Sequence, residues 1–178
     1  MESKLSAHLR AVIRRNSERN LAREVAMTKR QDYKTNVPRA FAAMLGVETY
    51  VRNSGLEKPL LELVKTRASQ INGCAYCLDM HTKDARAAGE TEQRLYTLSA
   101  WRETPFFTDR ERAALEWTEA VTQISSSHVS DALYNRVHQY FDNKELVDLT
   151  MAVIAINGWN RLAIAFQSVP GSYQPPKK

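Results

Sequence analysis

Two cysteines and one histidine form the most chemically specific cluster in the sequence. Cys74, Cys77 and His81 are spaced i, i+3 and i+7, so within a helix they would share one face over two turns. Asn72-Gly73 directly upstream predicts the end of the preceding helix, which would place both cysteines in the first turn of a new helix. Free backbone N–H groups and the helix dipole at that position favour a thiolate over a thiol.

Such a pair of sulfurs can carry out both halves of a redox cycle. A thiolate attacks the O–O bond of a peroxide and becomes a sulfenic acid, and a second thiol condenses with it to a disulfide. Histidine titrates near neutrality, so His81 is suited to move the protons that these steps require. Glu62 lies upstream in the aliphatic run 60–64. A carboxylate there either lies on the solvent-exposed face of the helix or has a functional role.

Two other interpretations of the cysteine pair stay open at this point. The pair could be structural, or it could be part of a zinc site. Cys74, Cys77 and His81 supply only three ligands, however, and the sequence contains no second cysteine pair. His128 and His138 lie outside the cluster, and we expect them to be structural or exposed.

The composition is that of a globular protein built around its own core. A length of 178 residues with 43% hydrophobic residues fits one domain plus a modest extension. Only two cysteines occur, with two residues between them, which argues against a secreted disulfide scaffold. No apolar run approaches the ~20 residues of a membrane span, and the N-terminus lacks the apolar stretch of a secretory signal. We therefore expect a cytoplasmic protein.

The net charge of +5 is confined to the N-terminal arm. Residues 1–30 hold eight Lys and Arg against three Asp and Glu, and the other residues hold 17 of each sign. The neutral remainder has no basic surplus, so nucleic acid is not an expected partner.

Helical signals follow one another along the chain, and no segment is typical of a strand. The expected helices are a basic helix over 4–26, then, after a polar joint at 29–36, helices from Pro38 to about Gly55, Pro59–Asn72, Cys74–Ala88, Thr91–Trp101, Thr108–Ile124, 131–141, and a long apolar helix capped by Asn143 and ending near Phe166. The pattern predicts an all-α bundle with a basic helical extension (1–30), a helical domain (31–168) and a mobile tail (169–178).

The segment ELVKTRASQINGCAYCLDMH, residues 62–81, resembles the signature of the carboxymuconolactone decarboxylase-like superfamily. It is most similar to the alkylhydroperoxidase D-like branch, which is marked by a Glu, eleven residues, CxxC, three residues and a His. The resemblance continues through HTKDARAAGET, WRETPFFTDRERAALEW and LVDLTMAVIAINGWNRLAIAF, and it covers about residues 31–168.

This resemblance implies an AhpD-like helical bundle that forms homo-oligomers, trimers or hexamers, and reduces hydroperoxides. It implies that Cys77 is the peroxidatic sulfur, that Cys74 resolves, and that Glu62 and His81 form a proton relay. A thiol reductant such as dihydrolipoamide or a thioredoxin-like protein would reduce the disulfide. No haem, flavin or metal cofactor is expected. Lactone decarboxylation is not expected either, because the namesake branch lacks the paired cysteines.

The chain departs from the family pattern at two places. Tyr76 stands between the cysteines where the best-characterised branch has a His, and residues 1–30 lie outside the pattern, so that Met27 could be the start of the core protein. We expect Trp159 to serve packing and Arg161 to have a buried acidic partner. The alternatives to a peroxidase are a general disulfide oxidoreductase and an oligomeric protein with a vestigial redox site.

Overall fold

The computed structural model describes residues 29–176, and this part of the chain is all-helical, as predicted. The predicted basic helix over 4–26 lies outside the described residues. The described elements are α2 (Tyr33–Asn36), α3 (Pro38–Arg52), α4 (Lys58–Asn72), α5 (Ala75–Ala87), α6 (Glu92–Thr97), the 3-10 helix η1 (Leu98–Glu103), α7 (Asp109–Thr122), α8 (Asp131–His138) and α9 (Asn143–Ala165). Between residues 29 and 176, no helix is long and apolar enough to cross a membrane.

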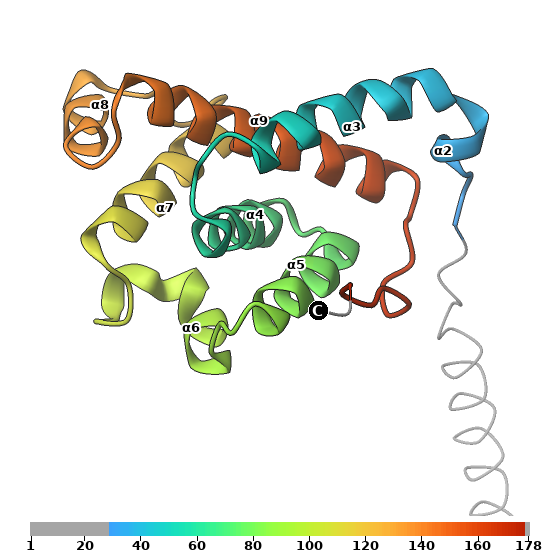
Figure 1. The fold of residues 1–178 in the computed structure, drawn as a ribbon, viewed down its shortest axis with the longest axis horizontal. Coiled ribbons are helices and arrows are strands. Elements are labelled where there is room, and N and C mark those ends of the chain that lie inside the picture. Colours follow the sequence, from blue (N-terminus) through green and yellow to red (C-terminus); the bar gives the residue numbers. More distant parts are fainter. Residues whose placement is uncertain (1–28, 177–178) are drawn as a thin grey trace, which may run out of the picture.

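Helix α4 lies at the centre of the bundle, where it packs against α5, α7 and α9 (Figure 1). Most of its side chains are buried, because apolar residues occur on nearly every face of it: Leu60, Leu61, Leu63, Val64 and Ala68. A helix that is apolar all round is stable only inside a layer of other helices. The central position of α4 thus follows from its sequence, and it places Glu62 inside the bundle.

Helix starts are the best predicted features of the fold. Thr108 caps α7 in a capping box with Glu111, as expected. The predicted N-cap of α9 is wrong by one position, because Asp142 and not Asn143 accepts the backbone N–H of Glu145, at 2.8 Å. Both residue types cap helices well, so their order along the chain could not decide between them.

Two segments differ from their predicted secondary structure. Residues 33–36 of the polar joint form the single turn α2, capped by Asp32. The predicted helix over 91–101 divides into α6 and η1, with non-helical dihedral angles at Ala100. This change of direction allows Trp101 to pack with Leu63 while its indole N–H donates to Glu119 at 2.9 Å. Tertiary packing therefore overrides the local helical pattern at this point.

A buried ion pair joins α3 to α4. The Lys65 ammonium lies 2.6 Å from Glu48, whose other cationic partner is Arg52 at 3.3 Å. Both members of the Glu48–Lys65 pair are buried, which limits screening by water. Burial alone would raise the pKa of the Glu48 carboxyl, but Lys65 and then Arg52 outweigh it, so the pKa of Glu48 is lowered from its usual value of 4.5.

The Glu48→Gln substitution is expected to lower the free energy of unfolding by about 3 kcal/mol at neutral pH, because it leaves Lys65 buried without a counter-charge. A lowered carboxyl pKa stabilises the fold above pH 4.5, and this contribution is lost as the pH falls through the lower pKa of the folded state. The difference between the two proteins should therefore shrink between pH 6 and pH 3. Denaturant unfolding at several pH values measures it, and a difference that does not change with pH would contradict the assignment.

Candidate active site

The two cysteines lie at the joint between α4 and α5. Gly73 ends α4 with a φ of +68°, a left-handed conformation that favours glycine, and Cys74 is the N-cap of α5. The Sγ of Cys74 accepts the backbone N–H of Cys77 at 3.3 Å. The two sulfurs are joined as a disulfide, and each residue is about 1% exposed. The predicted position of the pair at a helix start is thus confirmed.

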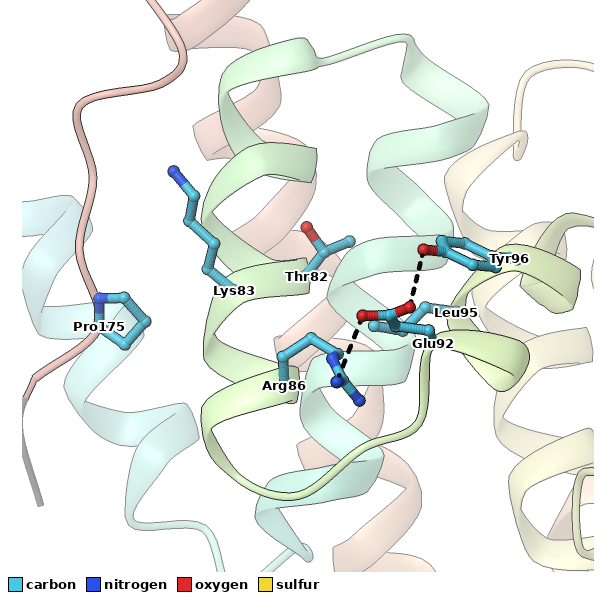
Figure 2. Close-up of a pocket in the computed structure, with 7 residues that line it drawn as sticks. All are labelled: Thr82, Lys83, Arg86, Glu92, Leu95, Tyr96 and Pro175. Atoms are coloured by element: carbon cyan, nitrogen blue, oxygen red, sulfur yellow. Dashed lines mark hydrogen bonds and ion pairs between the residues drawn. The ribbon is translucent and has the colours of Figure 1, made fainter.

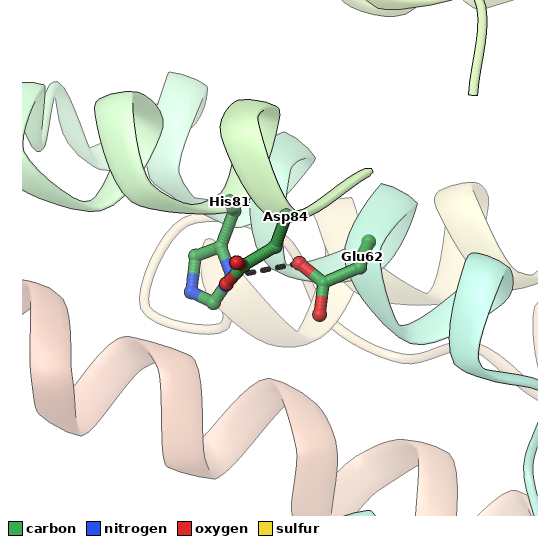
Figure 3. A group of neighbouring side chains, drawn as sticks. All are labelled: Glu62, His81 and Asp84. Carbon is green, nitrogen blue, oxygen red and sulfur yellow. Dashed lines mark hydrogen bonds and ion pairs between the residues drawn. The ribbon is translucent and has the colours of Figure 1, made fainter. Parts of the chain in front are cut away.

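His81 and Glu62 form a hydrogen bond across the two helices that flank this joint. The Nδ1 atom of His81 lies 2.9 Å from Oε2 of Glu62, and the side chains are 7% and 19% exposed. Glu62 therefore turns towards α5 instead of into solvent. Because Glu62 engages Nδ1, Nε2 is the ring nitrogen left for a substrate or a sulfur. Figure 3 shows the pair together with Asp84.

Asp84 and Tyr173 are neighbours of this pair that the sequence did not identify. Asp84 lies one turn after His81 on α5, and the hydroxyl of Tyr173, from the segment after α9, donates to its Oδ1 at 2.7 Å. The same segment is held at Gly171, whose N–H donates to Asp79 at 2.9 Å, and at Tyr173, whose carbonyl accepts from Lys83 at 3.1 Å. The i+3 spacing from His81 was an available signal for Asp84, whereas nothing in the sequence pointed to Tyr173.

The surroundings of Tyr173 raise its pKa well above the ordinary value of 10. Burial has the largest effect, followed by the hydrogen bond to Asp84 and by the negative charges of Asp84 and Glu62. The phenol consequently remains protonated at physiological pH, and it donates to Asp84 throughout that range.

Within the described part of the chain, one group of side chains could hold a metal ion: Glu62, His81 and Asp84. Their potential ligand atoms lie within 4.8 Å of one another. One imidazole and two carboxylates form a donor set suited to a borderline or hard divalent cation. The set differs from the zinc alternative considered above, since His81 is grouped with carboxylates and the two sulfurs are joined to each other.

A network of amides, two buried and one half-buried, fixes the end of α4 directly before the cysteines. The Asn72 amide donates to the side-chain oxygens of Asn157 at 3.0 Å and Asn160 at 2.8 Å. Asn160 in turn donates to the Ser69 hydroxyl at 3.0 Å. Because α9 supplies two of these amides, the long helix holds the chain in place just before the reactive joint.

Three other predictions concern residues near the ends of α8 and α9. Trp159 packs edge-on against Phe41, with ring centroids 5.7 Å apart, in agreement with a packing role. Arg161 does not have the expected buried acid as a partner within residues 29–176: its side chain is exposed and donates to the carbonyl and side-chain oxygens of Asn157. His128 is exposed, and His138 contacts an asparagine at the start of α9.

A pocket of about 390 Å³ lies between α5, α6 and the C-terminal segment (Figure 2). It is lined by Thr82, Lys83, Arg86, Glu92, Leu95, Tyr96 and Pro175. Glu92 pairs with Arg86 at 3.3 Å and accepts from the Tyr96 hydroxyl at 3.1 Å, so much of its polar lining is already paired. The cysteines, Glu62 and His81 do not line this pocket.

The fold and the site together define a class: small all-helical proteins with a CxxC pair at a helix start beside a Glu–His hydrogen bond. Residues 36–120 match the model of the Carboxymuconolactone decarboxylase family. The uncharacterized protein YdfG of Bacillus subtilis (strain 168) is 46% identical over 139 residues, which cover 78% of this chain and 95% of YdfG. The chain therefore belongs to the carboxymuconolactone decarboxylase family.

Two further relatives connect the chain to the AhpD name. A crystal structure from Agrobacterium tumefaciens, of a protein of unknown function described as a candidate antioxidant defence protein AhpD, superposes with a TM-score of 0.79 at 42% identity. It covers 82% of this chain and 100% of that one. The alkyl hydroperoxide reductase AhpD of Bradyrhizobium diazoefficiens is 35% identical over 75 residues, which cover 42% of this chain and 38% of that protein.

Proposed function

We propose that this protein is a thiol-dependent peroxidase, which reduces hydroperoxides through a dithiol–disulfide cycle of Cys74 and Cys77. The observation that carries the proposal is the position of the CxxC pair at the start of α5, on the helix whose His81 is bonded to Glu62. Thiolate stabilisation and proton transfer are thus available within one short stretch of structure. The relative named alkyl hydroperoxide reductase AhpD supports the same activity.

The cycle balances with these residues and an external dithiol. The Cys77 thiolate attacks the outer oxygen of the peroxide, the O–O bond breaks, and the departing alkoxide takes a proton from His81. The Cys74 thiolate then attacks the sulfenic sulfur of Cys77, the S–S bond forms, and hydroxide leaves as water after taking up a proton. A dihydrolipoamide- or thioredoxin-like thiol returns two electrons and two protons.

Two observations support the division of labour between the sulfurs. His81 is one helical turn from Cys77 and two turns from Cys74, so Cys77 is the sulfur better placed for proton transfer. Cys74 is the N-cap, and its sulfur accepts a backbone N–H, an interaction that suits the thiolate of the resolving step. We therefore assign attack to Cys77 and resolution to Cys74.

The proposal is tested by mixing the reduced protein with hydrogen peroxide, an organic hydroperoxide or a small disulfide in a stopped-flow instrument. A peroxidase loses its two thiols rapidly to at least one peroxide. Oxidation by the disulfide alone would favour a general disulfide oxidoreductase, and slow reaction with all three would favour a vestigial site. The double variant Cys74→Ser, Cys77→Ser is the blank.

We also propose that the protein is a homo-oligomer, a trimer or hexamer by resemblance. Val147 and Ile154 lie seven residues apart on α9 and are 58% and 50% exposed, and Leu45 and Tyr50 on the adjoining α3 are likewise exposed. Apolar side chains gathered in this way favour contact with a second subunit.

Light scattering is therefore expected to show an oligomer at micromolar concentration, and Ile154→Lys should dissociate it, since a charge would enter the contact. Ile124→Lys is the matched control, because Ile124 is equally exposed but follows α7. A monomeric wild-type protein, or equal effects of the two substitutions, would contradict the expectation.

A further inference from the structure

Thr66 has an unusual hydroxyl for a buried helical residue. Among residues 29–176, its Oγ1 is the one buried side-chain polar atom that has no hydrogen-bond partner. The residue is 0% exposed. Hydroxyls elsewhere in the helices donate to the carbonyl one turn back: Ser69 to Lys65 and Thr118 to Ala114, each at 2.7 Å. A buried unpaired hydroxyl is unfavourable, and such exceptions occur at redox and catalytic sites.

The register of the α4–α5 hairpin places Thr66 opposite Cys77. Glu62 on α4 bonds to His81 on α5, and nearer the turn the Cys74 N–H donates to the Ser69 carbonyl at 3.0 Å. Thr66 follows Glu62 by four residues, and Cys77 precedes His81 by four, so both lie one turn closer to the joint on the facing sides. The two helices are antiparallel, and the two positions therefore fall between the two observed contacts.

In the disulfide the Cys77 sulfur is held against Cys74, and the Thr66 hydroxyl has no hydrogen-bond partner among the described residues. The Cys77 sulfur is bonded to Cys74, carries no charge and is a weak acceptor. Reduction breaks that bond and leaves a thiolate, which accepts a hydrogen bond strongly because it is charged. Once the disulfide no longer holds the Cys77 sulfur against Cys74, a donor on the facing side of α4 can gain it as a partner, and it does so only in the reduced protein.

We propose that the Thr66 hydroxyl donates a hydrogen bond to the reduced Cys77 sulfur and so shifts the dithiol–disulfide equilibrium towards the dithiol. This inference rests on the proposed redox cycle of the cysteine pair and adds a residue that sets its potential. Stabilising the reduced form makes a disulfide a better oxidant. Thr66 is thus a positioning and tuning residue for the attacking sulfur.

The experiment is a redox titration of the full-length protein against dithiothreitol, with Thr66→Val as the test variant. Valine keeps the shape of threonine and removes only the hydroxyl. The equilibrium constant for reduction should fall about tenfold, the effect of one hydrogen bond to a charged group. The oxidised variant should melt at or above the wild-type temperature, because an unpaired buried hydroxyl has been replaced by a methyl group.

Two controls separate the hydroxyl from packing. Thr66→Ser retains the donor and loses a methyl group, so it should keep the wild-type equilibrium even if it is less stable. Thr118→Val removes a paired hydroxyl on α7 and should leave the equilibrium unchanged. An unchanged constant in Thr66→Val, or equal falls in Thr66→Val and Thr66→Ser, would overturn the proposal. No peroxide enters the titration, so a protein without peroxidase activity could still confirm it.

Discussion

Cys77→Ser is expected to abolish peroxide turnover, the largest effect of any single substitution in the chain. The serine hydroxyl is almost fully protonated at neutral pH, and no other thiolate lies one turn from His81. Only the uncatalysed reaction of Cys74 with peroxide should remain. Coupled turnover with an excess of dithiol measures the loss.

The Cys77→Ser result has a structural control. Both cysteines are fully buried in a small cluster with Ala68, Ile156 and Ala163, and serine in place of Cys77 changes its volume little. The variant should therefore keep its helical circular dichroism. Full turnover in a folded Cys77→Ser protein would mean that the roles of the two sulfurs are reversed or that the chemistry lies elsewhere.

Glu62→Gln and His81→Gln are each expected to slow thiol oxidation by about a hundredfold, the lower range of general acid–base effects. The His81 substitution removes the group that protonates the alkoxide. The Glu62 substitution removes the carboxylate that orients the imidazole, since Oε2 of Glu62 lies 2.9 Å from Nδ1 of His81.

Matched controls for the relay exist elsewhere in the helices. Glu116→Gln removes a carboxylate paired with Arg136 near the surface, and His138→Gln removes an imidazole whose Nε2 lies 2.9 Å from the Asn143 side-chain oxygen. Neither should change the rate of thiol oxidation. Wild-type rates in both Glu62→Gln and His81→Gln would contradict the relay, and they would mean that the two residues serve only as a packing contact between α4 and α5.

Much of the helical fold could be predicted because its signals are local. The Thr108 box, the Gly73 break and the apolar length of α4 each depend on neighbours within one or two turns. The Cys74–Cys77–His81 face was predictable for the same reason, since all three residues share α5.

The features that could not be predicted depend on contacts between distant parts of the chain. Tyr173 reaches Asp84 across 89 residues of sequence, and Trp101 breaks a helical pattern in order to reach Glu119. The apolar helix around Arg161 predicts a buried acid as its partner, yet the Arg161 side chain is exposed while its neighbours Asn160 and Ala163 are buried. The helical period predicts which residues share a face, but the packing of the helices decides which faces are covered.

The reaction of the Cys74→Ser variant with hydroperoxide tests the central proposal most directly. Without the resolving sulfur, Cys77 should react once and stop as a sulfenic acid, because attack and resolution are separate steps. The measurement is the mass of the intact protein and of its peptides after treatment with hydroperoxide and a sulfenic-acid trap such as dimedone. One dimedone adduct on Cys77, formed only after peroxide, is the predicted result. A Cys77 thiol that stays unmodified while the wild-type cysteines are oxidised by the same peroxide would contradict the account.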